Sequence, residues 1–322
     1  MSGEIENVII IGGGPAGLAA AIYNARARLS PLLFGGAPYG GQLMLTSDVE
    51  NYPGFDSILG PELIEKMRSH ARKYGTKIID QNIIKVDLSK SPFEISSLEK
   101  SFLTKTVIIA TGAKALWLGL PNETRLRGKG VSACATCDGF FFKDKIVAVV
   151  GGGDTALEEA LFLTRFVSQI HLFHRRDSFR GSKIMQDRVL NHPKIKVIWN
   201  TVIQDVLGEN RVEGIKIENT ISKTQETMNV DGLFVAIGHK PDTELFKGQI
   251  ELDEKGYVIT GAVAAIRNLN REKYSPDFQY TTSVSGVFAA GDNVDHLYRQ
   301  AGTAVGMGIA AAMELERWLE IQ

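Results

Sequence analysis

The sequence predicts an α/β protein with two doubly wound parallel sheets, the second inserted into the first. Three observations predict this fold class. A strand, a glycine-rich turn and a helix open the chain, the same pattern recurs near residue 150, and one more apolar strand with a long helix ends it. With 322 residues, the chain is also too long for one ordinary hydrophobic core and suits two domains of average size.

The first unit has the order of elements that a dinucleotide-binding fold requires. Its predicted elements are a strand at Val8–Ile11, a turn at Gly12–Gly17, an alanine-rich helix to about Arg28 and a second strand at Pro31–Phe34. In such a turn Gly12 makes the tight bend, Gly14 lets backbone amides approach a pyrophosphate, and Gly17 lets helix and strand pack closely. The positive N-terminal end of the helix favours the phosphates.

The second unit repeats this order. Its predicted elements are a strand at Ile146–Val150, a turn at Gly151–Ala156, a helix at Leu157–Phe166 and a strand at Gln169–Phe173. Each unit later has an apolar strand that ends in glycine, at Val107–Gly112 and at Leu233–Gly238. The sequence therefore predicts two Rossmann-like nucleotide-binding domains.

The tail returns to the first unit. Val287–Asp292 is another strand ending in Gly-Asp, and a helix follows from about Arg299 to Leu319, although the second unit is already complete by Gly238. We therefore expect one discontinuous domain made of residues 1–117 and 246–322, and a second made of residues 118–245. Pro121 and Pro241 lie near the two crossings, as in short linkers.

The only two cysteines, Cys134 and Cys137, lie in one short motif that Asp138 follows. Two thiols at this spacing can close a disulfide, open it and pass on two electrons. A zinc site would need two further ligands, and the six histidines show no ligand spacing, so no metal is expected. A structural disulfide closing so small a loop would gain little stability. Redox catalysis is favoured, with Asp138 as a general acid or as a helix N-cap.

The two nucleotide sites differ at the end of their second strands. In the second unit, His174–Arg180 places three arginines (Arg175, Arg176 and Arg180) where an NAD site has an acid, which suits the 2′-phosphate of NADPH. A solvated basic loop is the alternative. In the first unit, Phe34-Gly35-Gly36 carries no acid, so the residues alone leave FAD and NAD open there.

The overall composition excludes several classes of partner. The net charge is −1, with 44% hydrophobic and 23% charged residues, which gives no electrostatic case for nucleic acid or anionic membrane. The N-terminus lacks the pattern of a signal peptide, and no apolar stretch is long enough to span a membrane. A cytoplasmic location is the expectation.

Taken together, these motifs resemble the low-molecular-weight, bacterial-type thioredoxin reductases, a class-II pyridine nucleotide-disulfide oxidoreductase family, over essentially the whole chain. The residues that carry the resemblance are Gly12–Gly17, Gly40–Leu43, Glu50–Gly54, Ala110–Gly112, Cys134–Asp138, Gly151–Ala156, His174–Arg180, Gly291–Asp292 and Tyr298–Ala301.

The resemblance implies a homodimeric flavoprotein in which electrons pass from NADPH to FAD, to the Cys134–Cys137 disulfide and to oxidised thioredoxin. It implies FAD at Gly12, Gly14, Pro15, Ala16, Gly35, Gly36, Gly41, Gln42, Asn51, Ala110, Thr111, Gly112, Gly291, Asp292, Arg299, Gln300 and Ala301. It implies NADPH at Gly151, Gly153, Asp154, Thr155, His174, Arg175, Arg176, Arg180, Ile237 and Gly238. It also implies rotation of the domains about hinges near Lys114–Leu120 and Thr243–Lys247.

Two alternatives and one departure accompany this interpretation. The same relay could serve another thioredoxin-like, glutaredoxin-like or peroxiredoxin-reducing partner, and a non-catalytic sensor could signal through the same disulfide. The departure is Gly261–Tyr280, which is longer than the resemblance implies. We expect this segment to be a surface excursion on the FAD domain.

Overall fold

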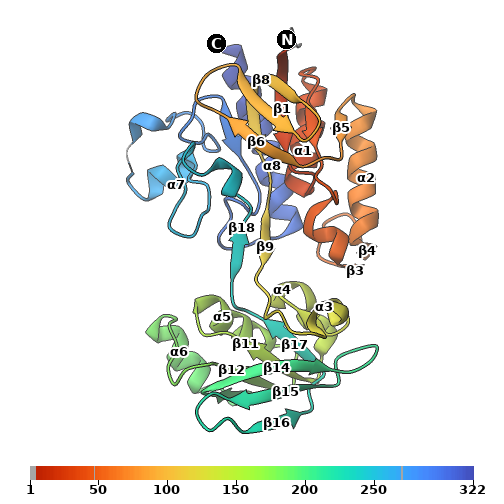
Figure 1. Cartoon of the computed structure of the whole chain (residues 1–322), viewed down its shortest axis with the longest axis vertical. Helices are drawn as coiled ribbons and strands as arrows, with labels where there is room; N and C mark the ends of the chain where they lie inside the picture. Colours follow the sequence, from red (N-terminus) through yellow and green to blue (C-terminus); the bar gives the residue numbers. More distant parts are fainter. Residues whose placement is uncertain (1–4, 47, 270) are drawn as a thin grey trace. The chain divides into compact units, whose positions relative to one another are not determined.

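The computed structural model describes residues 5–46, 48–269 and 271–322. The chain forms two compact units, each with its own sheet (Figure 1). Unit 1 joins the segments Met1–Lys114 and Lys240–Gln322, and unit 2 is the single segment Ala115–His239. The second unit is therefore inserted into the first.

Unit 1 is built on a seven-stranded sheet whose central strands are parallel. The order is β5-β2-β1-β8-β7-β6, with β19 also paired to β8. The bounds are β1 (Ile5–Ile11), β2 (Leu32–Phe34), β5 (Lys77–Ile79), β6 (Ile83–Asp87), β7 (Phe93–Ser97), β8 (Ser101–Ile109) and β19 (Val287–Ala289). Because β19 pairs in parallel with β8, the C-terminal segment is part of this sheet.

Three helices pack on this sheet: α1 (Pro15–Arg26), α2 (Gly60–Lys73) and α8 (Ala301–Glu320). Leu18 of α1, Ile64 of α2 and Leu315 of α8 are fully buried in one apolar cluster with side chains of the sheet. Helix α1 ends at Arg26, two residues earlier than expected, because the chain turns at Arg28, whose φ is +61°.

The segment between Gly261 and Tyr280 contains a short helix, α7 (Gly261–Ile266), and a 3-10 turn, η4 (Arg271–Lys273). Ile259, Ala264 and Tyr274 form a small buried cluster of their own. The Tyr274 hydroxyl donates to Glu251 at 2.8 Å, and burial together with this carboxylate raises the pKa of Tyr274. These contacts anchor the excursion to unit 1.

Unit 2 combines a five-stranded parallel sheet with a three-stranded antiparallel one. The parallel order is β10-β17-β11-β12-β13, with bounds β10 (Val131–Ser132), β11 (Ile146–Val150), β12 (Gln169–Phe173), β13 (Ile195–Ile198) and β17 (Gly232–Val235). The antiparallel strands are β14 (Thr201–Leu207), β15 (Gly214–Asn219) and β16 (Gln225–Met228). Two doubly wound parallel sheets are thus present, which confirms the predicted fold class.

The helices of unit 2 are α3 (Glu123–Leu126), α4 (Ala135–Asp138), α5 (Asp154–Leu163) and α6 (Lys183–Leu190). The predicted helix at Leu157–Phe166 is wrong at both ends. Helix α5 starts directly after Gly153, its N-cap, and it stops where the backbone N–H groups of Phe166 and Val167 both turn back to the carbonyl of Leu163.

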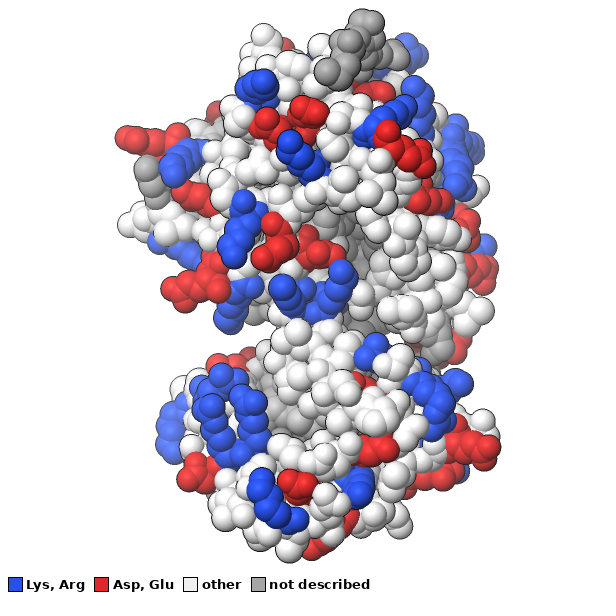
Figure 2. Space-filling model, in the orientation of Figure 1, with Lys and Arg blue, Asp and Glu red and all other residues white. Residues whose placement is uncertain are grey.

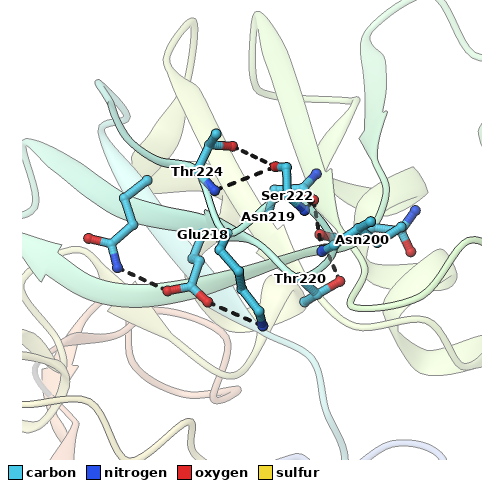
Figure 3. Close-up of polar contacts among 9 residues, drawn as sticks. Asn200, Glu218, Asn219, Thr220, Ser222 and Thr224 are labelled. Carbon is cyan, nitrogen blue, oxygen red and sulfur yellow. Dashed lines mark hydrogen bonds and ion pairs between the residues drawn. The ribbon is translucent and has the colours of Figure 1, made fainter.

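Polar side chains hold the turn between β15 and β16 (Figure 3). The Asn219 side-chain oxygen accepts from the backbone N–H groups of Ile221 and Ser222 at 2.9 and 3.0 Å. The Thr220 hydroxyl donates to the carbonyl of Asn200 at 3.0 Å, and the Ser222 and Thr224 hydroxyls lie 2.8 Å apart. These hydrogen bonds fix the turn that joins β15 to β16.

The remaining elements are short. They are β3 (Asp48–Val49), β4 (Ile58–Leu59), β9 (Ala113–Ala115), β18 (His239–Pro241) and the 3-10 turns η1 (Gly41–Leu45), η2 (Gly139–Phe142) and η3 (Glu244–Phe246). Strands β9 and β18 pair with each other where the chain passes between the units. In the described part of the chain, no helix combines the length and apolar character needed to cross a membrane.

Candidate active site

Cys134 and Cys137 form a disulfide at the start of α4, with their Cα atoms 5.3 Å apart. The backbone N–H of Cys137 donates to the Cys134 sulfur at 3.2 Å, and the Thr136 hydroxyl lies 3.3 Å from the same sulfur. Cys134 is half-buried, whereas Cys137 is exposed. The Cys134 sulfur therefore has a backbone N–H and a hydroxyl within hydrogen-bond distance.

The Asp138 carboxyl lies at the end of α4 and is half-buried. Burial raises its pKa, and a hydrogen bond with the Ser132 hydroxyl acts against this shift. Cys134 is the N-cap of α4, and Asp138 is the N-cap residue of the following 3-10 turn, η2. Among the described residues, the Asp138 side chain makes no capping bond to η2, so it is an N-cap by position and not through its carboxyl. What is left is a carboxyl that keeps its proton to higher pH than an ordinary aspartate.

Two exposed phenylalanines follow the dithiol, and the sequence reasoning missed them. Phe140 and Phe141 keep 63% and 43% of their surface exposed, whereas Phe142 is buried against Phe234 at 5.1 Å between ring centroids. The signal was available as three consecutive aromatic residues after the cysteine motif. Exposed aromatic residues beside a reactive pair are typical of a surface that contacts another protein.

The second glycine loop presents an open helix N-terminus. Gly153 is the N-cap of α5 and offers no capping side chain, and among the described residues nothing lies within 4 Å of a Cβ built on it. The Asp154 carboxylate instead accepts from the backbone N–H of Ser182 at 2.6 Å, which ties the loop before α6 to this helix. Backbone amides at such a helix end bind phosphate.

The His174 ring packs against this glycine loop. Its Nδ1 lies 2.9 Å from the carbonyl oxygen of Gly151, and a Cβ at Gly152 would overlap its ring, so a side chain at residue 152 would displace His174. Burial lowers the pKa of His174, which favours the neutral ring. The structure thus places His174 under the loop, with only 6% of its surface exposed.

The three arginines, by contrast, are exposed around this loop. Arg175 and Arg176 follow β12, and the backbone N–H of Arg180 donates to the carbonyl of Gly152 at 2.7 Å. Figure 2 shows Lys and Arg side chains gathered on this unit on the side where α6 lies in Figure 1. Ile237 and Gly238 follow β17, and Ile237 is 38% exposed. These residues suit a phosphorylated dinucleotide.

In unit 1, the first glycine loop lies at the carboxyl ends of β1, β2 and β8. The Gly12 N–H donates to the Phe34 carbonyl at 2.9 Å, and Gly12 has a φ of +124° at which a Cβ would overlap the carbonyl of Ala110. Helix α1 begins at Pro15, and Gly14, its N-cap, offers no capping side chain. Within the described ranges, nothing occupies the space within 4 Å of a Cβ on Gly14. A pyrophosphate fits this end of α1.

The other predicted FAD residues lie after β2, in η1, at Asn51 and after β8. Gly35 and Gly36 follow β2, η1 begins with Gly41 and Gln42, and the Asn51 amide donates to the Gln300 side chain at 3.1 Å. Ala110, Thr111 and Gly112 follow β8, and the Thr111 hydroxyl is buried with no partner among the described residues. An unpaired buried hydroxyl is what a bound polar ligand would satisfy.

The tail completes this edge. A Cβ at Gly291 would lie 2.8 Å from the side chain of Ala16, so the tail passes directly beside α1. Arg299 precedes Gln300, which caps the helix that begins at Ala301. Burial, together with the nearby Asp295, raises the pKa of Asp292 to about 6, and Arg299 opposes this shift.

Comparison with known proteins agrees with this geometry. The family model of the pyridine nucleotide-disulphide oxidoreductases matches residues 6–308. The thioredoxin reductase of Rickettsia felis is 50% identical over 97% of both chains, and that of Streptomyces coelicolor is 48% identical over 98% of this chain and 94% of that protein. The Streptococcus pyogenes thioredoxin reductase structure, 37% identical, covers 100% of both chains with a TM-score of 0.90. The chain therefore belongs to the pyridine nucleotide-disulphide oxidoreductases and, within them, to the thioredoxin reductase family.

Proposed function

We propose that this chain is an NADPH-dependent flavoenzyme that reduces the disulfide of a thioredoxin through Cys134 and Cys137. The observation that carries the proposal is the disulfide itself, which joins a half-buried and an exposed cysteine in the unit that also presents the arginine loop. Exposed Phe140 and Phe141 beside it favour a protein as the substrate.

FAD is proposed for unit 1, where the open N-terminus of α1, the buried Thr111 hydroxyl and the Asp292 carboxyl surround one edge of the sheet. When bound, FAD supplies the two-electron chemistry that links a nicotinamide to a disulfide. NADPH is proposed for unit 2, with its phosphates at the N-terminus of α5 and its 2′-phosphate on Arg175, Arg176 and Arg180.

The reduced dithiol then carries out thiol–disulfide exchange. One thiolate attacks the partner's disulfide and forms a mixed disulfide, which releases one partner sulfur as a thiolate. The second cysteine of the pair attacks the mixed disulfide, so that Cys134–Cys137 closes again and the partner leaves with two thiols. Asp138 is placed to give a proton to a leaving thiolate, because burial keeps its carboxyl protonated to higher pH.

The proposal includes a homodimer, a cytoplasmic location and rotation of the two units during the reaction, all of which stay predictions. Rotation would occur at the two connections between the units: β9 overlaps the first expected hinge, near Lys114–Leu120, and β18 precedes the second, near Thr243–Lys247. Small-angle scattering with and without NADPH tests rotation and oligomeric state together.

The catalytic proposal is tested by NADPH oxidation against a panel of purified thioredoxins, a glutaredoxin and a small disulfide dye. We expect sustained turnover with at least one thioredoxin. Turnover with the glutaredoxin alone would assign another partner to the same relay. A single stoichiometric oxidation of NADPH with every acceptor would indicate a sensor instead of an enzyme.

A further inference from the structure

The carboxyl end of β2 lacks the acid that normally binds the ribose of a dinucleotide in this fold, because Gly35 stands there. Strand β5 is the parallel neighbour of β2, with Phe34 opposite Ile79. The Gly35 N–H donates to the Ile79 carbonyl at 2.8 Å. The next residue of β5's segment, Asp80, therefore stands beside Gly35 at the same edge of the sheet.

A buried arginine holds the Asp80 carboxylate in place. Arg68, on α2, is 2% exposed and donates through Nη1 to Oδ1 at 3.0 Å and through Nη2 to Oδ2 at 2.7 Å. The ring of Tyr39 lies over the guanidinium, 4.0 Å from centroid to Cζ. A bidentate pair of this kind fixes the orientation of the carboxylate. A buried guanidinium also needs such a partner, because an unpaired charge there is costly.

The carboxylate occupies the space that a side chain at residue 35 would take. A Cβ built on Gly35 would lie 2.5 Å from Asp80 Oδ1, and a Cβ on Gly13 of the first glycine loop would lie 2.6 Å from the carbonyl oxygen of Gly35. The glycine loop, Gly35 and Asp80 are therefore consecutive neighbours along this edge. The Asp80 side chain is 38% exposed. Its two oxygens can each accept a further hydrogen bond beyond the one from Arg68.

We propose that Asp80 supplies, from the neighbouring strand, the carboxylate that binds the ribose hydroxyls of the adenosine half of FAD, and that Arg68 is its positioning residue. This inference rests on the proposal that unit 1 binds FAD. It explains why β2 can end in Gly35-Gly36 without an acid, since a second carboxylate at residue 35 would collide with the first.

The first test measures the release of FAD from the purified holoprotein after dilution, followed by the rise in flavin fluorescence. Asp80→Asn keeps the shape and one accepting oxygen for Arg68. We expect it to release FAD about tenfold faster or more, since a hydrogen bond to a charged group is lost. Glu65→Gln is the matched control: Glu65 lies 3.6 Å from Nε of the same Arg68, and its loss should leave the rate within about twofold.

Changing the ligand distinguishes a direct contact between Asp80 and the ribose from a merely structural role of Asp80. Wild type and Asp80→Asn are also loaded with a flavin dinucleotide whose adenosine lacks the 2′-hydroxyl. If Asp80 binds that hydroxyl, the analogue leaves the wild type faster than FAD does, and Asp80→Asn adds little further. If Asp80 only holds the loop, the variant speeds release of both ligands by the same factor, which would overturn the inference.

The second test relocates the carboxylate. Asp80→Ala empties the space beside Gly35, and Gly35→Asp in that background returns an acid at the end of β2. We expect the double variant to hold FAD longer than Asp80→Ala does, whereas Gly35→Asp alone weakens binding through the collision. Equal release rates for Asp80→Ala and the double variant would count against the inference. If the wild type carries no FAD, the proposed function fails as well; if it carries FAD and these substitutions are silent, this inference alone fails.

Discussion

Asp138 shows how one side chain can be assigned between chemistry and structure. Its position after the second cysteine suits both a helix cap and a proton donor. The cap of α4 is the Cys134 sulfur, which accepts from the backbone N–H of Cys137. The Asp138 carboxyl instead hydrogen-bonds with Ser132 and has a raised pKa because it is buried. Ser132 also accepts from the backbone N–H of Cys134 at 3.0 Å, so one hydroxyl contacts both the acid and the backbone of Cys134.

The first prediction therefore concerns Asp138→Asn. We expect near-normal melting, unchanged reduction of the flavin by NADPH, and a thiol step slowed about 10²–10⁴-fold. In the wild type that step should slow as pH rises through the raised pKa of Asp138, because the proton is then lost, and the variant should lack this pH dependence. Rapid-mixing absorbance follows the two steps separately. Asp144→Asn, at an exposed turn six residues later, is the control. An unchanged thiol step in Asp138→Asn would leave this carboxyl without a catalytic role.

The second prediction concerns Asp292, whose pKa burial raises to about 6 in the folded chain, well above the usual range of an aspartate. The ionised carboxylate is disfavoured by folding, so stability should fall as pH rises from about 4 to about 6. Asp292→Asn removes this cost, which is at most about 3 kcal/mol. We expect the flavin-free variant to need more urea than the wild type at pH 7 and a similar amount at pH 4. Asp277→Asn, an exposed aspartate of the same unit, should match the wild type at both.

At the scale of elements, the loop after β12 carries the three arginines that the sequence predicted, and the fold leaves them exposed to solvent. His174 and Phe179 are buried within it, with Phe179 packed on Trp199 at 4.4 Å between ring centroids, and this leaves the arginines outside. The sequence could indicate the arginines because the end of the second strand has a fixed place in the fold. It could not show that His174 lies under Gly152, because that contact depends on packing across 22 residues.

The third prediction follows from this loop. Replacing Arg175, Arg176 and Arg180 with glutamine should raise the KM for NADPH far more than the KM for NADH. Each lost charge-assisted contact costs about 1.5–3 kcal/mol, or about tenfold or more. Steady-state kinetics with both cofactors gives the ratio. Arg188→Gln on α6, also exposed, is the control. Equal effects on the two cofactors would show that the loop does not bind the 2′-phosphate.

A buried carboxylate fixes the backbone at the C-terminal end of the hinge expected near Lys114–Leu120, so fewer residues of that segment can move. Glu123, fully buried at the start of α3, accepts from the backbone N–H groups of Leu118 and Gly119 at 2.9 and 2.8 Å. Fixed backbone of this kind resists rotation. We therefore expect motion to be taken up before Leu118, where β9 pairs with β18. The sequence could place a linker here, but not the side chain that shortens it.

At the scale of the whole molecule, the repeated strand–glycine–helix pattern was enough to predict both sheets and the return of the tail. Each of these elements is defined by local sequence, and β1, β8 and β19 are apolar runs with one place in a parallel sheet. The contacts that the sequence did not reveal are those that depend on the order of strands in the sheet. Asp80 lies 45 residues from Gly35 and reaches it only because β5 pairs with β2. The FAD and NADPH contacts themselves stay predictions.

The fourth prediction uses the division of the chain into two units. Unit 2 holds both the dithiol and the proposed NADPH loop, while unit 1 holds the proposed FAD edge. Removing one sulfur should therefore stop thiol–disulfide exchange without disturbing either nucleotide site. In Cys134→Ser and in Cys137→Ser we expect NADPH still to bleach the flavin absorbance, while reduction of thioredoxin falls to the background.

Anaerobic titration and a coupled thioredoxin assay measure these two halves in the same preparation. Thr136→Ser is the matched control, because it keeps a hydroxyl beside the Cys134 sulfur and both thiols, and it should retain both activities. A cysteine variant that still reduces thioredoxin at a measurable rate would mean that electrons leave the protein by a route other than this disulfide. Loss of flavin bleaching in a cysteine variant would mean that the motif also takes part in binding a nucleotide.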